Sequence, residues 1–144
     1  PLIKKGLIKC MISYSHGKME LYDFLVKSFP DLSKQTYWKV NNGKHFVEWV
    51  WGEYDDSQII CCAAIFRDYE SKDAYKMGLF CVHPDYRGQG IGTHFYQYIM
   101  KAYKKVKWST ITDEAQHFYQ KQGAIKLGSQ KGADSRIYLL FSNY

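Results

Sequence analysis

Three glycines at alternate positions, Gly88, Gly90 and Gly92, constrain this chain more than any other feature of its sequence. They follow an apolar run over residues 77–82 and begin a segment, residues 91–102, whose apolar side chains recur at helical spacing. A backbone without Cβ atoms can turn sharply and lets a ligand approach its N–H groups. Because the first N–H groups of a helix lack internal partners at its positive end, the segment predicts a pyrophosphate-binding site.

Residue identities argue against two other phosphate-binding loops. A dinucleotide fingerprint G-x-G-x-x-G would need glycine in place of Thr93 if it began at Gly88, and in place of Phe95 if it began at Gly90. The Gly-Lys-Ser/Thr of a nucleotide-binding P-loop is absent. A glycine-rich turn that binds no ligand remains the alternative.

The other patterns predict one α+β domain over residues 1–144, since 144 residues with 46% hydrophobic content can bury a single core. We expect strand 7–14, helices 21–29 and 32–40, strands 46–54, 58–66 and 77–82, a helix from residue 91, strand 106–111, a helix over about 112–122, and strands 125–127 and 136–141. Two of these strands are apolar on both faces, as central strands covered by helices would be. The expected fold is therefore αβα layers around a mixed sheet of about six to seven strands, with about four helices.

The sequence gives no sign of export or membrane insertion. The longest apolar run, residues 59–66, is too short to span a bilayer, and residues 1–5 lack a secretory pattern. We expect a soluble cytoplasmic protein that makes no membrane contact.

The cysteines do not resemble metal ligands or a disulfide framework. Cys10, Cys61, Cys62 and Cys81 lie in apolar, strand-like segments without paired spacing, so small buried side chains are expected. The five histidines also lack metal-ligand spacing, and no metal is expected.

The positive charge is unevenly distributed. Of a net charge of +6, residues 73–144 carry ten Lys and Arg against five Asp and Glu. An anionic ligand, a nucleic acid or a solvated basic face would each suit this excess. The basic cluster of Lys101, Lys104, Lys105 and Lys107 lies at a predicted helix end, where cations are favoured anyway, and no nucleic-acid motif accompanies it.

The segment from Leu79 to Gly92 resembles the acetyl-CoA signature of the GNAT superfamily of N-acetyltransferases. The core pattern of that family, Arg/Gln-x-x-Gly-x-Gly/Ala, is met by Arg87, Gly90 and Gly92. A second motif, Ala-x-x-Phe-Tyr-x-x-x-Gly, is met by residues 115–123. The resemblance is specific over residues 77–127 and implies an acetyl-CoA-dependent N-acetyltransferase of GNAT-like fold.

The resemblance also implies how the cosubstrate acetyl-CoA would bind. Backbone groups of residues 80–82 would pair with the pantetheine arm, and N–H groups of residues 88–93 would hold the pyrophosphate. In the family, the strands that correspond to residues 77–82 and 106–111 splay apart, and the arm inserts beside the first of them. The implied cofactor-binding residues are Phe80, Cys81, Val82, Arg87, Gly88, Gln89, Gly90, Ile91, Gly92, Thr93, Thr112, Phe118 and Tyr119.

Acetyl transfer to an amine requires a neutral nucleophile, a hydrogen-bond donor to the thioester carbonyl, and an acid for the departing thiolate. The resemblance assigns the acid to Tyr119, since a phenol of pKa about 10 can donate to a thiolate whose thiol has a pKa of about 8.5. An aromatic side chain that packs the helix on the sheet is the alternative for Tyr119. The Val82 N–H is the implied carbonyl donor.

No residue stands out as the general base. The candidates are Glu48, Glu53, Asp73 and His117, each of which suits a surface or satisfied polar role better, and a water chain would serve as well. Cys81 is expected to make backbone contacts rather than to form an acetyl-cysteine.

Two residues depart from the family pattern. Thr112 stands where the family commonly has asparagine, which leaves one hydrogen bond to the cofactor open. Ala124 stands where phenylalanine is usual, which weakens a packing contact.

The sequence does not identify the acceptor. A primary amine of a small molecule or of a peptide is compatible with the resemblance, and a homodimer is left open. The aromatic residues Tyr37, Trp38, Trp49 and Trp51 would line an acceptor pocket or pack in the core. A non-catalytic acyl-CoA-binding sensor and a basic nucleic-acid-binding module are the alternative functions.

Overall fold

The computed structural model describes residues 8–13, 19–54 and 58–144. Seven strands form one sheet in the order β1-β2-β3-β4-β5-β7-β6. The strands are β1 (Ile8–Ser13), β2 (Phe46–Tyr54), β3 (Gln58–Arg67), β4 (Tyr75–Val82), β5 (Val106–Thr110), β6 (Ile125–Lys131) and β7 (Ile137–Ser142). The helices of the described residues are α1 (Met19–Ser28), α2 (Lys34–Asn41), α3 (Ile91–Tyr103) and α4 (Asp113–Lys121), with a 3-10 turn, η1, at Pro84–Tyr86.

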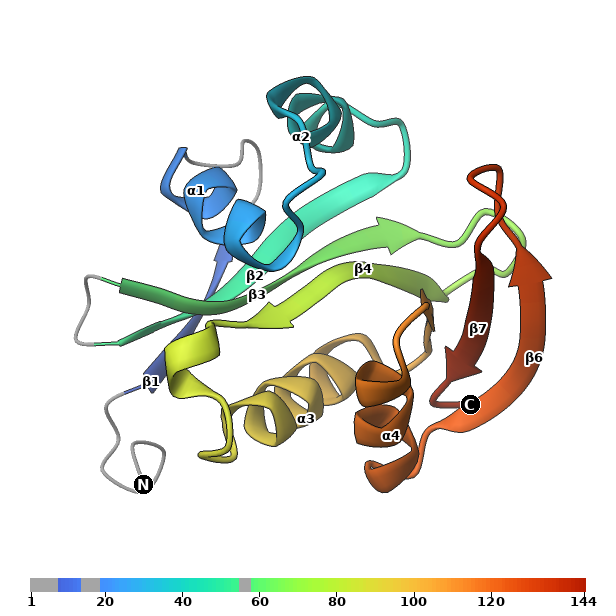
Figure 1. The fold of residues 1–144 in the computed structure, drawn as a ribbon. Coiled ribbons are helices and arrows are strands. Elements are labelled where there is room, and N and C mark those ends of the chain that lie inside the picture. The colour runs from blue at the N-terminus through green and yellow to red at the C-terminus, as the bar shows by residue number, and fades with distance from the viewer. Residues whose placement is uncertain (1–7, 14–18, 55–57) are drawn as a thin grey trace.

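The helices cover the sheet in two layers. Helices α1 and α2 lie on one face and α3 and α4 on the other (Figure 1). Each pair seals its own apolar cluster against the central strands. On one face α1 and α2 contribute Leu21, Phe24, Leu25 and Tyr37, and on the other α3 and α4 contribute Ile91, Phe95, Tyr96, Ile99 and Tyr119. The expected αβα arrangement around a mixed sheet is confirmed.

Strands β4 and β5 pair over a short distance and then part. They are the parallel neighbours of the sheet, and their register comprises three pairs: Tyr75 with Val106, Lys76 with Lys107, and Met77 with Trp108. Beyond Met77, β4 bends at a bulge, because two of its residues oppose one of β3 and Leu79 has a φ of 51°. The predicted splay between these strands is therefore confirmed.

Two strands extend beyond their predicted limits by two residues or more. Strand β4 begins at Tyr75 rather than at Met77, because Tyr75 and Lys76 pair with β5. Strand β6 continues past Leu127 to Lys131, although its last four residues have no apolar pattern. These residues form a strand because their backbone pairs with β7 at the edge of the sheet.

The remaining expectations concern cysteines and membrane contact. Cys61, Cys62 and Cys81 are buried free thiols, as predicted, and the side chain of Cys10 lies outside the described residues. Among the described helices, none is both long and apolar enough to cross a membrane.

A buried amide joins α2 to the sheet. Asn41 is 6% exposed, and its Nδ2 donates to the Tyr37 carbonyl at 3.0 Å. Its Oδ1 accepts a hydrogen bond from Trp49 Nε1. The amide thus satisfies an indole N–H that has no access to water, since Trp49 is fully buried.

Replacing Asn41 by leucine is expected to lower the free energy of unfolding by about 2 kcal/mol, because the Trp49 N–H loses its acceptor. Urea denaturation followed by tryptophan fluorescence measures the change. Asn42→Leu is the matched control, since Asn42 is exposed and its Nδ2 donates to the Trp38 carbonyl at 2.9 Å. Equal losses in the two variants would contradict a special role for the buried amide.

Candidate functional site

The glycine-rich turn has the backbone that its sequence predicts. Gly88 and Gly90 have φ values of 78° and 82°, in the left-handed region that glycine occupies without a steric penalty. Gly90 is the N-cap of α3 and offers no side chain to the helix end. The first bonded N–H of the helix is that of His94, which donates to the Gly90 carbonyl at 3.1 Å.

The N–H groups before His94 form an open run. Within the described part of the chain, none of those from Gly88 to Thr93 has an acceptor. They lie at the positive end of a 13-residue helix, where an anion is favoured. The Arg87 side chain lies at the same corner, because its Nε donates to the Val82 carbonyl at 3.1 Å. The turn therefore offers several amide donors and one cation to an anionic ligand.

The first turn of α3 packs closely against β4 and α4. A Cβ at Gly92 would stand 3.2 Å from the Phe118 ring and 3.5 Å from the Val82 side chain, so a larger residue there would require the Phe118 ring to move by a few tenths of an ångström. Gln122 Nε2 also donates to Thr93 Oγ1 at 2.9 Å, which ties the end of α4 to the start of α3. Contacts with β4 and α4 thus hold the start of α3, and with it the N–H groups of Gly92 and Thr93, in place.

At the end of β4, the backbone groups of Val82 point into the gap between β4 and β5, which separate beyond Met77 and Trp108. The His83 N–H donates to the Ile60 carbonyl of β3 at 2.7 Å. Because backbone groups alternate in direction along a strand, those of Val82 point away from β3, to the side from which β5 has departed, and those of Cys81 point toward β3. The Phe80 ring packs between β4 and the helices, 5.4 Å from Phe95.

Tyr119 lies under this gap and is 5% exposed. Its ring is 5.9 Å from Phe80, 5.1 Å from Trp108 and 6.2 Å from Tyr96, and Phe118 precedes it on α4. Burial in these aromatic surroundings raises the pKa of Tyr119 well above its usual range, with smaller effects from Tyr96 and Cys81. Its hydroxyl donates to no group that the structure describes, so a neutral phenol is available to a ligand.

Trp108, on β5, was not singled out from the sequence. Its side chain is almost fully buried, and its Nε1 has no hydrogen-bond partner among the described residues. A buried donor without an acceptor costs about 1 to 3 kcal/mol. Nothing in a strand-like segment shows whether an indole N–H finds a partner, so sequence reasoning had no signal for this feature.

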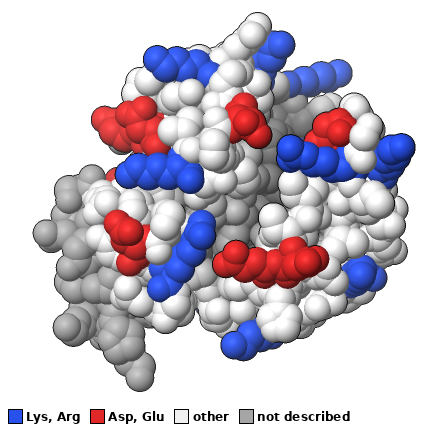
Figure 2. Space-filling model, viewed as in Figure 1, with Lys and Arg blue, Asp and Glu red and all other residues white. Residues whose placement is uncertain are grey.

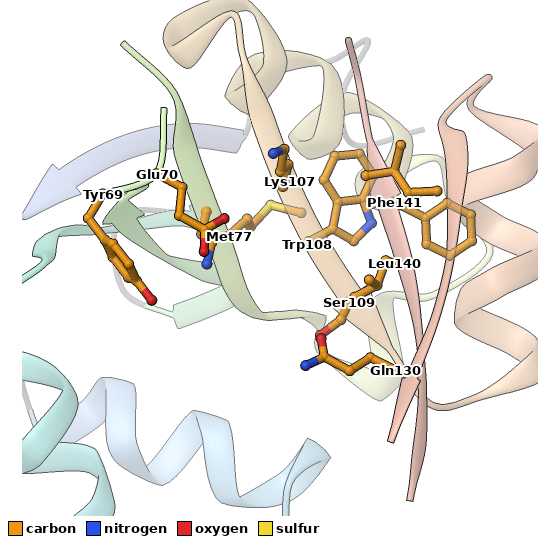
Figure 3. Close-up of a pocket in the computed structure, with 11 residues that line it drawn as sticks. Tyr69, Glu70, Met77, Lys107, Trp108, Ser109, Gln130, Leu140 and Phe141 are labelled. Atoms are coloured by element: carbon orange, nitrogen blue, oxygen red, sulfur yellow. The ribbon is translucent and has the colours of Figure 1, made fainter. Parts of the chain in front are cut away.

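A pocket of about 490 Å³ opens where β4 and β5 part (Figure 3). Its floor is Met77, Trp108 and Phe141, which stand in one row across three strands. Its other lining residues are Tyr69, Glu70, Lys76, Lys107, Ser109, Leu127, Gln130 and Leu140. The pocket therefore presents an apolar floor at the split and charges of both signs at its walls.

None of the predicted bases lines this pocket. Glu48 is buried, and burial raises its pKa, but it lies on β2 with β3 between it and β4. Glu53 accepts a hydrogen bond from Trp51 Nε1 at 3.1 Å. Asp73 lies in the loop before β4 and His117 is exposed on α4. Glu70, in the same loop as Asp73, does line the pocket and was missed from the sequence.

The departures from the family pattern have local roles. Thr112 caps α4, since its Oγ1 accepts from the Ala115 N–H at 3.1 Å, and the hydroxyl proton stays available. Gly123 ends the helix with a φ of 84°. Ala124 packs at the edge of the core, and its N–H donates to the Tyr119 carbonyl at 3.1 Å.

Most of the candidate acceptor aromatics belong to the core. Tyr37, Trp49 and Trp51 are buried between α1, α2 and the sheet, and the Tyr37 and Trp49 rings stack at 5.4 Å. Trp38 is 36% exposed. The packing interpretation of these residues is therefore correct for three of the four.

The lysines of the predicted basic cluster lie at the end of α3 or contact neighbouring side chains. Lys101 lies in the last turn of α3 and Lys104 is its C-cap, as the helix-end interpretation predicts. Lys107 Nζ is 3.7 Å from the buried Asp68 carboxylate, and Lys105 and Lys107 both lie over the Tyr144 ring. Acidic side chains stand among the basic ones on the face shown in Figure 2, where no single basic patch forms. Among the described residues, no cluster of His, Cys, Asp and Glu could hold a metal ion.

Solved structures share this fold at low sequence identity. A candidate N-acetyltransferase from Lactobacillus plantarum matches with a TM-score of 0.76 and 15% identity, over 94% of this chain and 96% of that chain. An aminoglycoside 6'-N-acetyltransferase complexed with coenzyme A matches with a TM-score of 0.72 and 14% identity, over 92% and 96%. An acyl-CoA N-acyltransferase from Pseudomonas aeruginosa matches with a TM-score of 0.72 and 12% identity, over 95% and 99%.

The family assignment comes from the sequence. A comparison with the sequences of curated proteins finds no match. The family model of the acetyltransferase (GNAT) domain matches residues 46–123, more than half of the chain, from β2 through the glycine-rich turn to the end of α4. Together with the splayed strands and the open amides at the start of α3, this match settles the resemblance: the chain belongs to the GNAT family of acetyltransferase domains.

Proposed function

We propose that this protein is an acetyl-CoA-dependent N-acetyltransferase whose acceptor is a primary amine of a small molecule or a peptide. The observation that carries the proposal is the open run of N–H groups from Gly88 to Thr93 beside the gap between β4 and β5. A pyrophosphate is the anion that such a run suits, and Arg87 adds a cation at the same corner. One similar structure has coenzyme A bound, which supports an acyl-CoA as the ligand.

The direction of β4 supports one direction for the cofactor arm. With its pyrophosphate at residues 88–93, the pantetheine would lie along β4 from Val82 back toward Met77. The Val82 N–H, which faces the gap, supports this placement, since an inserted chain would satisfy it; the Val82 carbonyl already accepts from Arg87. The acyl group, at the far end of the arm, would then lie above Tyr119, where β4 and β5 separate.

The residues around the gap supply the acid and the acceptor site. We assign Tyr119 as the acid that protonates the sulfur when the C–S bond breaks, because its ring lies beside Phe80 and Trp108 at the gap and its hydroxyl has no partner among the described residues. Burial keeps the phenol protonated, and the same rise in its pKa makes it a weaker acid than a free phenol. The Val82 N–H, which the resemblance assigns to the thioester carbonyl, would on this path pair with an amide of the arm instead, since Val82 lies about 16 Å along β4 from the row of Met77 and Trp108. We place the amine in the pocket whose floor is Met77, Trp108 and Phe141, because that pocket opens at the split. The amine proton would leave through water in this open pocket, since no described carboxylate or imidazole stands at the floor.

Titration of the protein with acetyl-CoA by isothermal calorimetry tests the first half of this proposal. Saturable one-to-one binding is expected, and its enthalpy should survive removal of the acetyl group, since free coenzyme A keeps the pyrophosphate. The complete absence of binding would refute both an enzyme and an acyl-CoA sensor.

A panel of primary amines, with release of free thiol as the readout, tests the second half. Turnover with a small-molecule amine or a peptide amino terminus is expected to exceed hydrolysis of the thioester alone. Tight binding without turnover on any amine would favour the non-catalytic sensor.

A further inference from the structure

We infer that the indole N–H of Trp108 donates a hydrogen bond to the thioester carbonyl oxygen of the bound acyl-CoA, which makes Trp108 a catalytic residue of this acetyltransferase. The inference rests on the proposed function, and it starts from a donor that the protein itself leaves without an acceptor. It identifies a side-chain donor for the carbonyl at the row of Met77, where the Val82 N–H does not reach.

The state of Trp108 differs from that of the other tryptophans. Trp49 Nε1 donates to Asn41, and Trp51 Nε1 donates to Glu53 at 3.1 Å. Trp38 is 36% exposed, so water can reach it. Trp108 is 5% exposed, and its Nε1 has no partner among the described residues. Since buried donors are normally paired, an acceptor supplied by a ligand would explain this exception.

Trp108 occupies the point where the two strands separate. Its pairing with Met77 is the last of the β4–β5 register, and beyond it the gap widens. The indole stands 5.1 Å from the Tyr119 ring and also contributes to the floor of the pocket. Trp108 therefore stands between the proposed acid, whose ring it contacts, and the pocket that it lines.

The reacting carbonyl is the part of the cofactor that reaches this point. The arm enters at the glycine-rich turn and runs back along β4, so its amide groups pass the end of the strand and only its acyl end reaches the row of Met77 and Trp108. Negative charge develops on the carbonyl oxygen when the amine attacks. A donor fixed among Tyr96, Tyr119 and Phe141 would stabilise that charge without reorganisation, because these rings exclude water.

Replacement of Trp108 by phenylalanine keeps an aromatic ring and removes the N–H. We expect kcat with acetyl-CoA to fall by about 100-fold, the range found when one donor to a developing oxyanion is removed. The melting temperature of the free protein should stay the same or rise, since an unpaired buried donor is lost. The affinity for free coenzyme A, which has no thioester carbonyl, should not change. Trp49→Phe is the matched control, with a lower melting temperature and an unchanged kcat.

Wild-type protein gives an independent test by NMR. The 1H–15N spectrum contains one indole signal for each of four tryptophans, and that of Trp108 is assigned by its loss in Trp108→Phe. If that variant does not fold, phenylalanine replacements of the other three assign it by elimination. The signal is expected to move downfield with acetyl-CoA and to stay in place with S-ethyl coenzyme A, a thioether without the carbonyl.

Two results would overturn the inference while the proposed function stands: an unchanged kcat in Trp108→Phe, or an indole signal that responds equally to the thioester and the thioether. If wild-type protein binds neither compound, the proposed function fails as well.

Discussion

Replacing Gly90 by valine is expected to weaken acetyl-CoA binding by about 100-fold or more. Gly90 has a φ of 82°, which a β-branched residue avoids, so the N-cap must change its backbone conformation. That change redirects the neighbouring N–H groups, and hydrogen bonds from such groups to a charged acceptor contribute about 1.5 to 3 kcal/mol each. Loss of two of them gives the expected factor, which calorimetric titration measures directly.

Strain at a positive φ also lowers stability, so the binding effect needs a matched control. Gly128 has a φ of 147° in β6, and a Cβ there would meet nothing within 4 Å. Gly128→Val is expected to lower the melting temperature and to leave the affinity for acetyl-CoA unchanged. If both variants bind acetyl-CoA like the wild type, the cofactor does not use the N–H groups at the start of α3.

The sequence predicts this turn well because its requirements are local. Glycine adopts a positive φ without a steric penalty, and Gly88, Gly90 and Gly123 all have positive φ in the structure. Local composition also predicts β2 correctly, because the bounds Phe46–Tyr54 match the apolar and β-branched run of the sequence. The sequence also offers Thr112 or Asp113 as the cap of α4, and in the structure the cap is Thr112, whose side-chain oxygen satisfies a free N–H.

Features that depend on tertiary contacts between segments distant in the sequence could not be predicted from local patterns. The polar second half of β6, residues 128–131, is a strand because β7 offers it a backbone to pair with. Glu70 reaches the pocket only because the loop between β3 and β4 folds beside the split. The unpaired N–H of Trp108 results from the joint packing of β5, α3 and α4. Each is a property of tertiary contacts, which no local pattern encodes.

Replacing Tyr119 by phenylalanine separates the two interpretations of that residue. If its hydroxyl protonates the leaving thiolate, kcat is expected to fall by about 10² to 10⁴-fold, the usual contribution of a general acid. The free energy of unfolding should change little, since the ring contacts remain and the hydroxyl has no partner among the described residues. Steady-state kinetics with an accepted amine, together with urea denaturation, measure both quantities.

Tyr96→Phe is the matched control for this replacement. Its ring lies 6.2 Å from that of Tyr119, and burial raises its pKa as well. The proposed mechanism gives Tyr96 no proton to transfer, so kcat should stay within about twofold of the wild type, a difference of about 0.4 kcal/mol in the barrier. Equal losses in the two variants would mean that both residues act through packing.

The pH dependence of the rate distinguishes these interpretations further. An acid acts in its protonated form, and burial raises the pKa of Tyr119 above the ordinary value of 10.0, so this residue should cause no decline in kcat below pH 10. The same shift favours folding below the pKa of the unfolded chain, and that stability is lost as the pH rises through the raised pKa. A decline that begins near pH 8 and persists in Tyr119→Phe therefore belongs to another group. A decline near pH 8 that disappears in the variant would show that the phenol ionises there and is not held neutral by its aromatic surroundings.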